Sequence, residues 1–338
     1  MTSRVRVNSA VSFSKPDMIP VDYWILPGSY LKYGDAIFGL LEKYPKDFPE
    51  SAERDNFLPP SHRKGLYKDA FGSVWRQEFD GCIGIVAEHP MSDWSALQTY
   101  SLPEITGGEI TLEQTKNIIA RHKTLEKYVC ADFIRTFERL HFIRGMEDVM
   151  MDIATGSKDM FLFLERIVEW NIAHIKCVLD AAGDDIDGIW FSDDWGMQRS
   201  LLISPRKWRE VFKPIYKRMF DFVKGSGKAV FLHSDGCITD IIDDLIELGV
   251  NALNCQIELM GAELLAERFG GRIAFHTDLD RQSILPFGTT AELRKHIEKI
   301  VAALGGYTGG LILNAEFGPD VPLENIRCVF ETFDEIRR

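Results

Sequence analysis

Short apolar strands alternate with amphipathic helices from about residue 160 to the C-terminus, and glycine closes most of the helices. Apolar residues at helical spacing predict a helix over 161–182, and a short apolar run predicts a buried strand over 186–191. The same pair of elements then recurs, with strands predicted over 228–233, 250–255, 272–277 and 311–315 and helices over 205–225, 238–248, 261–269, 290–304 and 323–336. Repeated strand–helix units imply parallel strands joined by right-handed crossovers. The chain therefore belongs to the α/β class.

A closed barrel and an open doubly wound sheet both fit this alternation. Polar residues recur at successive strand ends and no glycine-rich fingerprint follows the first strand, so we predict a (β/α)8 TIM barrel. The N-terminal half is less regular: we expect the first strand over 18–25, a hairpin segment over 81–87 and the second barrel strand over 129–137. Residues 26–128, rich in Pro, Trp and charged residues, are predicted to form an irregular elaboration. With no low-complexity linker and no internal repeat, residues 1–338 are predicted to form one domain.

Charge and cysteine content narrow the expected partners and compartment. A formal net charge of −12 argues against a nucleic-acid partner, because phosphate backbones are bound by clustered Lys and Arg. Six cysteines without CxxC spacing do not make a disulfide framework in a chain of 338 residues. The sequence has neither a signal-peptide pattern nor an apolar stretch of transmembrane length. We therefore expect a cytoplasmic protein that is not embedded in a membrane.

Polar side chains follow the predicted strands, at the barrel end from which catalytic groups project. The sharpest case is His233-Ser234-Asp235-Gly236, which follows an apolar strand. Residues i and i+2 of an extended segment point the same way, so His233 and Asp235 should face one pocket. There they can bind a metal or act as acid and base. In the plainer interpretation, Asp235 caps the next helix and His233 fills a polar layer of the barrel.

Seven short segments share a characteristic order and spacing: DDWG at 193–196, ISP at 203–205, HSDG at 233–236, ELGVNALN at 247–254, DLD at 278–280, LPFGT at 285–289 and PLEN at 322–325. Together they resemble the uroporphyrinogen decarboxylase superfamily, which also contains corrinoid-dependent methyltransferases and demethylases. The resemblance implies a (β/α)8 barrel. True uroporphyrinogen decarboxylases carry arginines near the N-terminus that bind the substrate carboxylates, but residues 23–34 contain none here. The chain is therefore more similar to the methyltransferase and demethylase branch.

In that branch, a His-x-Cys pair after one strand and a cysteine near the last strand bind zinc. By resemblance, His233 takes the place of the histidine, Asp235 stands at the first cysteine, and Asn314 or Glu316 lies near the second. Cys255 is a further candidate ligand, although a buried strand residue is its plainer interpretation. An oxygen-rich set suits zinc that acts on a substrate oxygen better than zinc that holds a thiolate. The resemblance thus implies metal-assisted transfer of a methyl group from a small methylated substrate to a corrinoid protein or a thiol. Because family members are often dimers, it also implies a homodimer.

The candidate site residues form two further groups. The candidate catalytic residues are Asp194, His233, Asp235, Asp278 and Asp280. The candidate substrate-binding residues, which would give aromatic walls and polar contacts for a small or planar substrate, are Tyr23, Trp24, Trp195, Gln256, Glu258 and His276. For each aromatic residue, packing in a core is the plainer interpretation, as is a structural role for His276.

Two other functions fit the same residues. One is a decarboxylase of the uroporphyrinogen type that acts through Asp194 and its neighbours without a metal. The other is a non-catalytic barrel subunit that binds a corrinoid protein or a small ligand. Metal analysis separates the first two functions, and alanine substitution of His233 and Asp235 separates both enzymes from the scaffold.

Overall fold

A parallel sheet forms most of a closed barrel in the computed structural model, which describes residues 1–50, 53–108 and 110–337. Six strands pair in parallel in the spatial order β10-β9-β8-β7-β6-β5. Their bounds are β5 (Cys130–Ile134), β6 (Gly188–Ser192), β7 (Ala229–Ser234), β8 (Ala252–Cys255), β9 (Ala274–His276) and β10 (Leu311–Ile312). Parallel neighbours in chain order are the arrangement that right-handed strand–helix units produce.

Two N-terminal segments close this barrel. The strand β1 (Trp24–Ile25) pairs in parallel with β11 (Glu316–Phe317), just beyond β10. The Asp47 N–H donates to the Val21 carbonyl at 2.9 Å, and the Tyr128 N–H donates to the Asp47 carbonyl at 3.0 Å. The segment around Asp47 thus takes the second position in chain order, between β1 and β5, and completes the eight positions around the barrel. The barrel prediction is confirmed, but the strand predicted over 129–137 takes the third position instead of the second.

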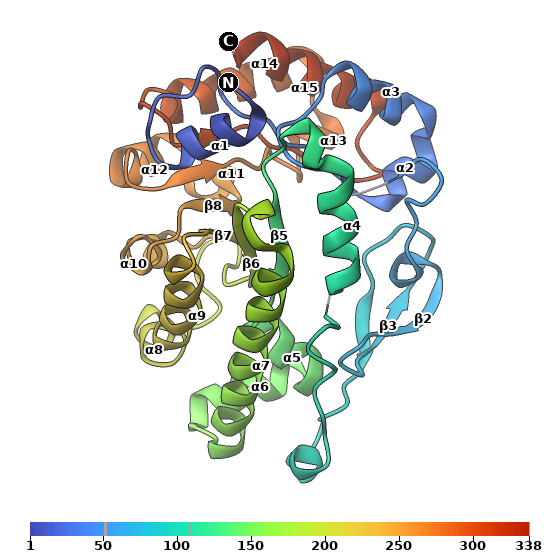
Figure 1. Cartoon of the computed structure of the whole chain (residues 1–338), viewed down its shortest axis with the longest axis vertical. Helices are drawn as coiled ribbons and strands as arrows, with labels where there is room; N and C mark the ends of the chain where they lie inside the picture. Colours follow the sequence, from blue (N-terminus) through green and yellow to red (C-terminus); the bar gives the residue numbers. More distant parts are fainter. Residues whose placement is uncertain (51–52, 109, 338) are drawn as a thin grey trace.

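Helices surround the barrel, and both chain ends lie near α14 and α15 (Figure 1). The α-helices of the described ranges are α1 (Ser3–Val11), α2 (Pro27–Tyr33), α3 (Asp35–Lys43), α4 (Leu112–His122), α5 (Phe137–Arg144), α6 (Met146–Thr155), α7 (Lys158–Ala182), α8 (Pro205–Val211), α9 (Lys213–Gly225), α10 (Ile242–Leu248), α11 (Ile257–Met260), α12 (Ala262–Phe269), α13 (Ile284–Phe287), α14 (Thr290–Leu304) and α15 (Leu323–Ile336). Short 3-10 turns supplement them: η1 (Pro60–His62), η2 (Trp94–Gln98), η3 (Lys123–Leu125), η4 (Gly183–Asp185) and η5 (Thr239–Ile241).

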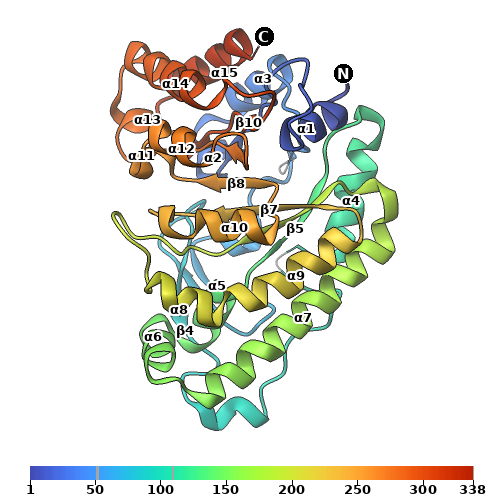
Figure 2. The ribbon, with the colours of Figure 1, turned by 90° about the vertical axis from the view of Figure 1, so that its left-hand side faces the viewer.

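The helix predicted over 205–225 is interrupted. It forms α8 and α9 with a break at Phe212, just before Pro214, which has no N–H to continue the helical hydrogen bonds. The α9 segment packs along the long helix α7, as Figure 2 shows. None of the described helices pairs enough length with enough apolar side chains to span a bilayer.

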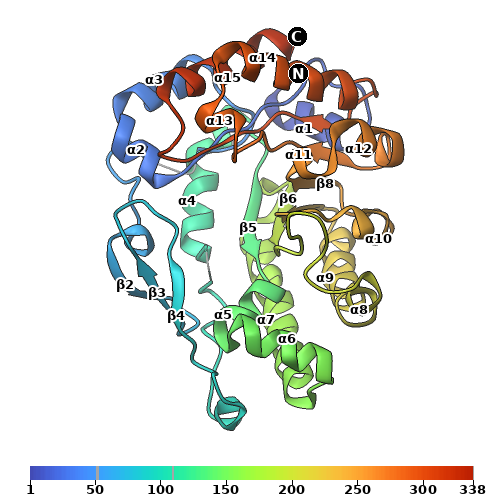
Figure 3. The same ribbon diagram turned by 180° about the vertical axis from the view of Figure 1, so that it is seen from behind.

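The region 26–128 adds a small sheet to the barrel; its residues 51–52 and 109 lie outside the described residues. Strands β2 (Gly65–Lys68), β3 (Val74–Gln77) and β4 (Ile85–Glu88) pair in antiparallel order. Figure 3 shows this sheet at one flank of the molecule, away from α8 and α9. The predicted hairpin segment over 81–87 overlaps β4. The sheet brings residues distant in sequence to the mouth of the barrel.

The inside of the barrel is apolar at one end and polar at the other. Inward side chains such as Trp190, Phe231 and Ile312 pack with Val7 and Ala10 of α1, which plugs the N-terminal end of the barrel. Two residues further along each strand, toward the carboxyl ends, the inward residues become polar because side chains of a strand alternate between faces. This change places the chemistry of the barrel at its C-terminal mouth.

Candidate metal and substrate site

A cavity of about 610 Å³ opens at the carboxyl ends of the strands. Its aromatic and aliphatic lining comes mostly from the N-terminal region and β5: Trp24, Tyr67, Phe71, Trp75, Ile83, Phe133 and Phe142. Its charged lining comes mostly from the later strands and their loops: Asp69, Arg135, Glu138, Arg139, Asp194, His233, Asp235, Arg281 and Glu316. A concave apolar site with a few convergent charged groups is the usual form of a small-molecule site.

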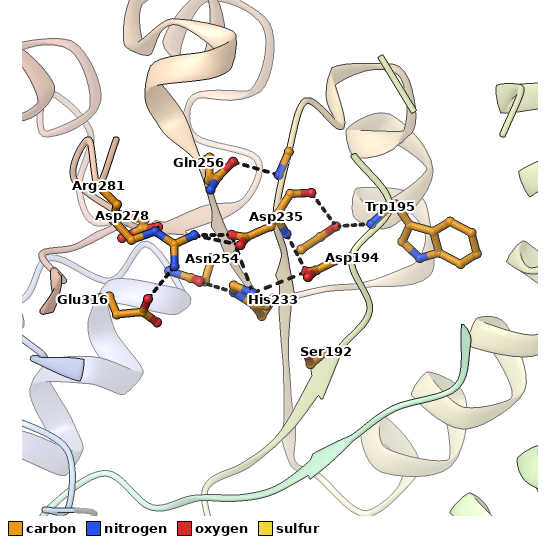
Figure 4. Close-up of polar contacts among 12 residues, drawn as sticks. Ser192, Asp194, Trp195, His233, Asp235, Asn254, Gln256, Asp278, Arg281 and Glu316 are labelled. Carbon is orange, nitrogen blue, oxygen red and sulfur yellow. Dashed lines mark hydrogen bonds and ion pairs between the residues drawn. The ribbon is translucent and has the colours of Figure 1, made fainter. Parts of the chain in front are cut away.

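Asp194, His233 and Asp235 form a compact cluster at the cavity wall (Figure 4). The Nε2 atom of His233 lies 3.5 Å from Oδ1 of Asp194 and 3.7 Å from Oδ1 of Asp235. One ligand atom from each residue falls within 4.8 Å of the other two, a spacing that a single metal ion can bridge. Burial alone would lower the pKa of His233, but the charges of Asp235 and Asp194 raise it above its ordinary value. The two carboxylates therefore attract positive charge to Nε2.

Two glycines allow the loops after β6 and β7 to bring these carboxylates together. Gly236 has a φ of +82°, and a Cβ atom there would lie 2.1 Å from the backbone of Gly196. The Gly196 N–H donates to the Asp235 carbonyl at 3.0 Å, and the Asp235 N–H donates to Oδ1 of Asp194 at 2.8 Å. Only glycine permits so close an approach of two backbones. The glycines of the DDWG and HSDG segments thus have a direct role in shaping the site.

Arg281 links three acidic residues beside the cluster (Figure 4). Its guanidinium donates to both oxygens of Asp235 at 2.6 and 2.8 Å, to Glu316 at 2.5 Å, and it lies 2.9 Å from Asp278. Burial raises the pKa of Asp278 to about 7, although the charge of Arg281 lowers it in part. Sequence reasoning did not identify Arg281, because the residue follows the DLD segment without a local pattern that marks it.

Glu138 faces the cavity from α5. Its Oε2 atom accepts a hydrogen bond from Ser192 at 3.1 Å and from Arg135 at 3.0 Å. Burial raises the pKa of Glu138 to about 7, although the charge of Arg135 lowers it in part. A carboxyl group that titrates near neutral pH can hold or release a proton at the cavity wall. Sequence reasoning also missed this residue, since it lies in a helix and not at a strand end, where catalytic groups of a barrel are expected.

Asp193, the neighbour of Asp194, has a structural role. It is buried and accepts backbone N–H groups of Thr136 and Glu138 together with the hydroxyl of Tyr216 at 2.6 Å. Burial raises its pKa to about 6, against the effect of these donors. Asp193 thereby fixes the turn between β5 and α5, and so the position of Glu138.

The other candidate residues are distributed between three places. Trp24 lines the cavity, whereas Gln256, Glu258, Asp278 and Asp280 line a second, smaller cavity of about 290 Å³, which shares Arg281 with the first. Asp280 is engaged locally: its Oδ1 accepts the N–H groups of Gln282 and Ser283 at 2.9 Å. His276 lies fully buried inside the barrel, beneath the cavity.

Four candidate residues lie away from the cavity wall or outside the metal-competent cluster. Tyr23 stacks on Phe330 at 3.8 Å between ring centroids, on the outer face of the barrel, because it neighbours the inward-facing Trp24. Trp195 is fully buried, stacks on Phe137 and donates to the Tyr216 hydroxyl, so it is not a cavity wall.

The other two residues are the candidate metal ligands Cys255 and Glu316. Cys255 is buried in the apolar core, and Glu316 pairs with Arg281; both lie outside the metal-competent cluster, in which Asp194 is the third member. Asp194 was a candidate for catalysis and not for metal binding. Its proximity to His233 arises from the pairing of β6 with β7.

A family model and solved structures match this chain. The family model of uroporphyrinogen decarboxylase matches residues 140–336, more than half of the chain. A methyltransferase from Methanosarcina mazei has a TM-score of 0.75 at 17% sequence identity, with 99% of each chain covered. A 3-keto-D-glucoside 4-epimerase from E. coli has a TM-score of 0.41 at 12% identity, covering 75% of this chain and 97% of the epimerase. No curated protein matches the chain by sequence.

Proposed function

The chain belongs to the uroporphyrinogen decarboxylase family, and from that premise we propose that it is a metal-assisted methyltransferase or demethylase. Its substrate is a small methylated compound bound in the 610 Å³ cavity. Its methyl acceptor is a corrinoid carried by a partner protein, or a thiol. Asp194, His233 and Asp235 hold the metal, for which zinc is the first candidate.

The observation that carries this proposal is the convergence of one imidazole nitrogen and two carboxylates at the cavity wall. Nε2 of His233 lies at ion-pair distance from both carboxylates, 3.5 Å from Asp194 and 3.7 Å from Asp235. The three side chains are partly exposed to the cavity, as an ion that meets substrate requires. Three protein ligands are also the number that catalytic zinc sites commonly use, with the remaining position left for substrate. The donor set therefore fits a divalent metal.

The charge of the cavity favours a methylated substrate over a polycarboxylate. Five acidic side chains line it (Asp69, Glu138, Asp194, Asp235 and Glu316) against three arginines (Arg135, Arg139 and Arg281). Each of these arginines is paired with a carboxylate of the protein itself. A substrate with many carboxylates would meet repulsion and no free guanidinium. This observation weighs against decarboxylation of a porphyrinogen.

Different residues of the chain have different roles in methyl transfer. A divalent metal bound at the cluster would supply Lewis-acid polarisation of the heteroatom that carries the methyl group. Trp24, Phe71, Trp75 and Phe133 hold the apolar part of the substrate and exclude water. Glu138 at Oε1 or Oε2 delivers a proton to the heteroatom as the methyl group leaves, because its pKa near 7 keeps it partly protonated.

Metal content and methyl transfer test the proposal together. Purified protein is stripped with a chelator and reloaded with zinc, and its bound metal is measured by elemental analysis. Free cob(I)alamin then serves as the acceptor, with methanol, guaiacol, trimethylamine and dimethyl sulfide as probes, and methylcob(III)alamin is followed by its absorbance. We expect activity only with the reloaded protein.

Two outcomes would contradict the proposal. A protein that binds no metal yet releases carbon dioxide from a porphyrinogen would be a decarboxylase. A protein whose ligand binding is unchanged in both His233→Ala and Asp235→Ala, with no turnover of any probe, would be a binding subunit.

A further inference from the structure

A line of buried polar side chains crosses the barrel directly beneath the metal-competent cluster. His233, Asn254 and His276 are register partners on β7, β8 and β9, so their side chains form one layer inside the barrel. Asn254 is 1% exposed and His276 is fully buried. Oδ1 of Asn254 lies 2.5 Å from Nδ1 of His233 (Figure 4). The layer therefore connects the cluster with the interior of the barrel.

Two backbone carbonyls fix which way the Asn254 amide points. Its Nδ2 atom donates to the carbonyl oxygens of His276 at 2.9 Å and Thr277 at 3.1 Å. A carbonyl oxygen can only accept, so the opposite amide orientation would place three oxygens together in the core without a proton between them. Nδ2 must therefore face the carbonyls, and Oδ1 must face His233.

This orientation decides where His233 carries its proton. The amide oxygen of Asn254 has no hydrogen to give, so the 2.5 Å contact requires an N–H at Nδ1 of His233. A neutral imidazole has one N–H, which leaves a lone pair on Nε2, the atom that faces Asp194 and Asp235. We propose that Asn254 is a positioning residue that holds His233 in this tautomer and so keeps Nε2 ready to bind the metal. The inference rests on the metal site of the proposed function.

Beyond Asn254, the same layer is anchored on a buried ion pair. The Asp22 carboxylate is ion-paired with Lys46 and can only accept, so Nε2 of His276, 3.2 Å from Oδ2 of Asp22, carries the proton. Nδ1 of the neutral His276 then faces Nδ2 of Asn254 at 3.2 Å. The other oxygen of Asp22 accepts from Nζ of Lys46 at 2.9 Å. His233 thus donates to Asn254 at one end of the layer, and His276 donates to Asp22 at the other. Reversal of the His233 tautomer would leave the Asn254 oxygen without a donor.

Nuclear magnetic resonance of the metal-free protein tests the tautomer without any assay of activity. The two ring nitrogens of His233, identified by loss of their signals in His233→Ala, differ in 15N shift according to which one bears the proton. We expect a protonated Nδ1 and an unprotonated Nε2 when the imidazole is neutral. A neutral His233 with its proton on Nε2 would overturn the inference.

Zinc affinity of matched asparagine variants provides the second test. Asn254→Ala should weaken zinc binding about 10- to 100-fold, the usual cost of losing an outer partner of a metal-binding histidine. The control is Asn251→Ala on the same segment: Oδ1 of Asn251 also accepts a hydrogen bond from β7, at 2.8 Å from the N atom of Val230, but at the end of the strand away from His233. It should leave the zinc affinity unchanged.

The outcomes separate this inference from the proposed function. Equal zinc affinity in Asn254→Ala and the wild type would overturn the role of Asn254 even if the wild type binds zinc tightly. A wild type that binds no zinc would overturn the proposed function, while the tautomer measurement would still decide what Asn254 does. That measurement uses the wild type, so it stands even if Asn254→Ala does not fold.

Discussion

The two halves of this molecule contribute different things to one cavity. The C-terminal part, from β5 onward, is regular and supplies Glu138, Asp194, His233, Asp235 and Arg281 from strand ends, loops and one helix. The N-terminal part is irregular and supplies mainly aromatic and aliphatic walls from β1, β2, β3 and their loops. The family model covers nearly the same C-terminal part, residues 140–336. The charged groups and most of the apolar walls of the cavity are thus encoded in separate segments of the chain.

Removal of His233 should have the largest effect, because it is the only nitrogen in the described cluster. We expect His233→Ala to reduce methyl transfer by about 1000-fold, about 4 kcal/mol, since losing a direct ligand exceeds the 10- to 100-fold cost of losing an outer partner. Zinc titration and the cobalamin assay measure the two losses. Full activity of this variant would place the chemistry elsewhere.

Removal of Arg281 should cost stability in the C-terminal part. Arg281→Met leaves the carboxylates of Asp235, Asp278 and Glu316 without their shared cation, and we expect a loss of about 3 kcal/mol in the free energy of unfolding. Urea denaturation measures it. The control is Arg218→Met, which breaks exposed pairs with Glu165 and Glu169 and should cost at most about 1 kcal/mol. Similar losses of unfolding free energy in both variants would show that Arg281 stabilises the fold no more than an exposed arginine does.

Glu138 should set the pH dependence of the reaction. Its protonated form is the proton donor, so wild-type turnover should fall as the pH rises through about 7. Glu138→Gln should lose about 100-fold in kcat, about 3 kcal/mol. The remaining kcat of this variant should no longer fall as the pH rises through about 7. If kcat of the variant still falls near pH 7, another group is responsible for this pH dependence.

The raised pKa of Glu138 should also make the free energy of unfolding depend on pH, in a direction that can be predicted. The folded state holds the Glu138 proton to a higher pH than the unfolded chain, in which the carboxyl has its ordinary pKa of about 4.5. Between these two values the folded state binds more protons, so the free energy of unfolding falls as the pH rises from about 4.5 to about 7. The fall should be smaller in Glu138→Gln. Equal slopes would show that Glu138 is ionised throughout.

The smallest effect is expected in the N-terminal wall. Trp75 contacts Phe142 edge-to-face at 4.8 Å and donates to Asp69 at 2.9 Å. Trp75→Phe should raise KM about 10-fold with kcat and zinc affinity nearly unchanged, because it alters a wall and not the charged groups. Trp94→Phe is the matched control, since Trp94 also donates to a carboxylate, that of Asp152, but does not line the cavity. Loss of zinc affinity in Trp75→Phe would contradict the division between the two halves.

Sequence reasoning predicted the pairing of His233 with Asp235 because both lie on one short extended segment, where the direction of side chains follows from the backbone. It did not predict that Arg281 joins Asp235 to Glu316, residues 81 positions apart in sequence, since no local rule connects three separate strand ends. It also named both Tyr23 and Trp24 as walls, although adjacent strand residues face opposite sides. Which of the two faces inward depends on how β1 pairs with β11.

The sequence by itself determined the alternation of strands and helices, the closed barrel and the strand ends that carry acids and histidine, because these depend on periodicity and local backbone preference. Tertiary structure alone decided that Asp194 completes the cluster, that Glu316 and Cys255 lie outside it, and that Glu138 faces the cavity. Those outcomes depend on the register between strands and on the close contact of Gly196 with Gly236. Both are distances between segments that no single segment encodes.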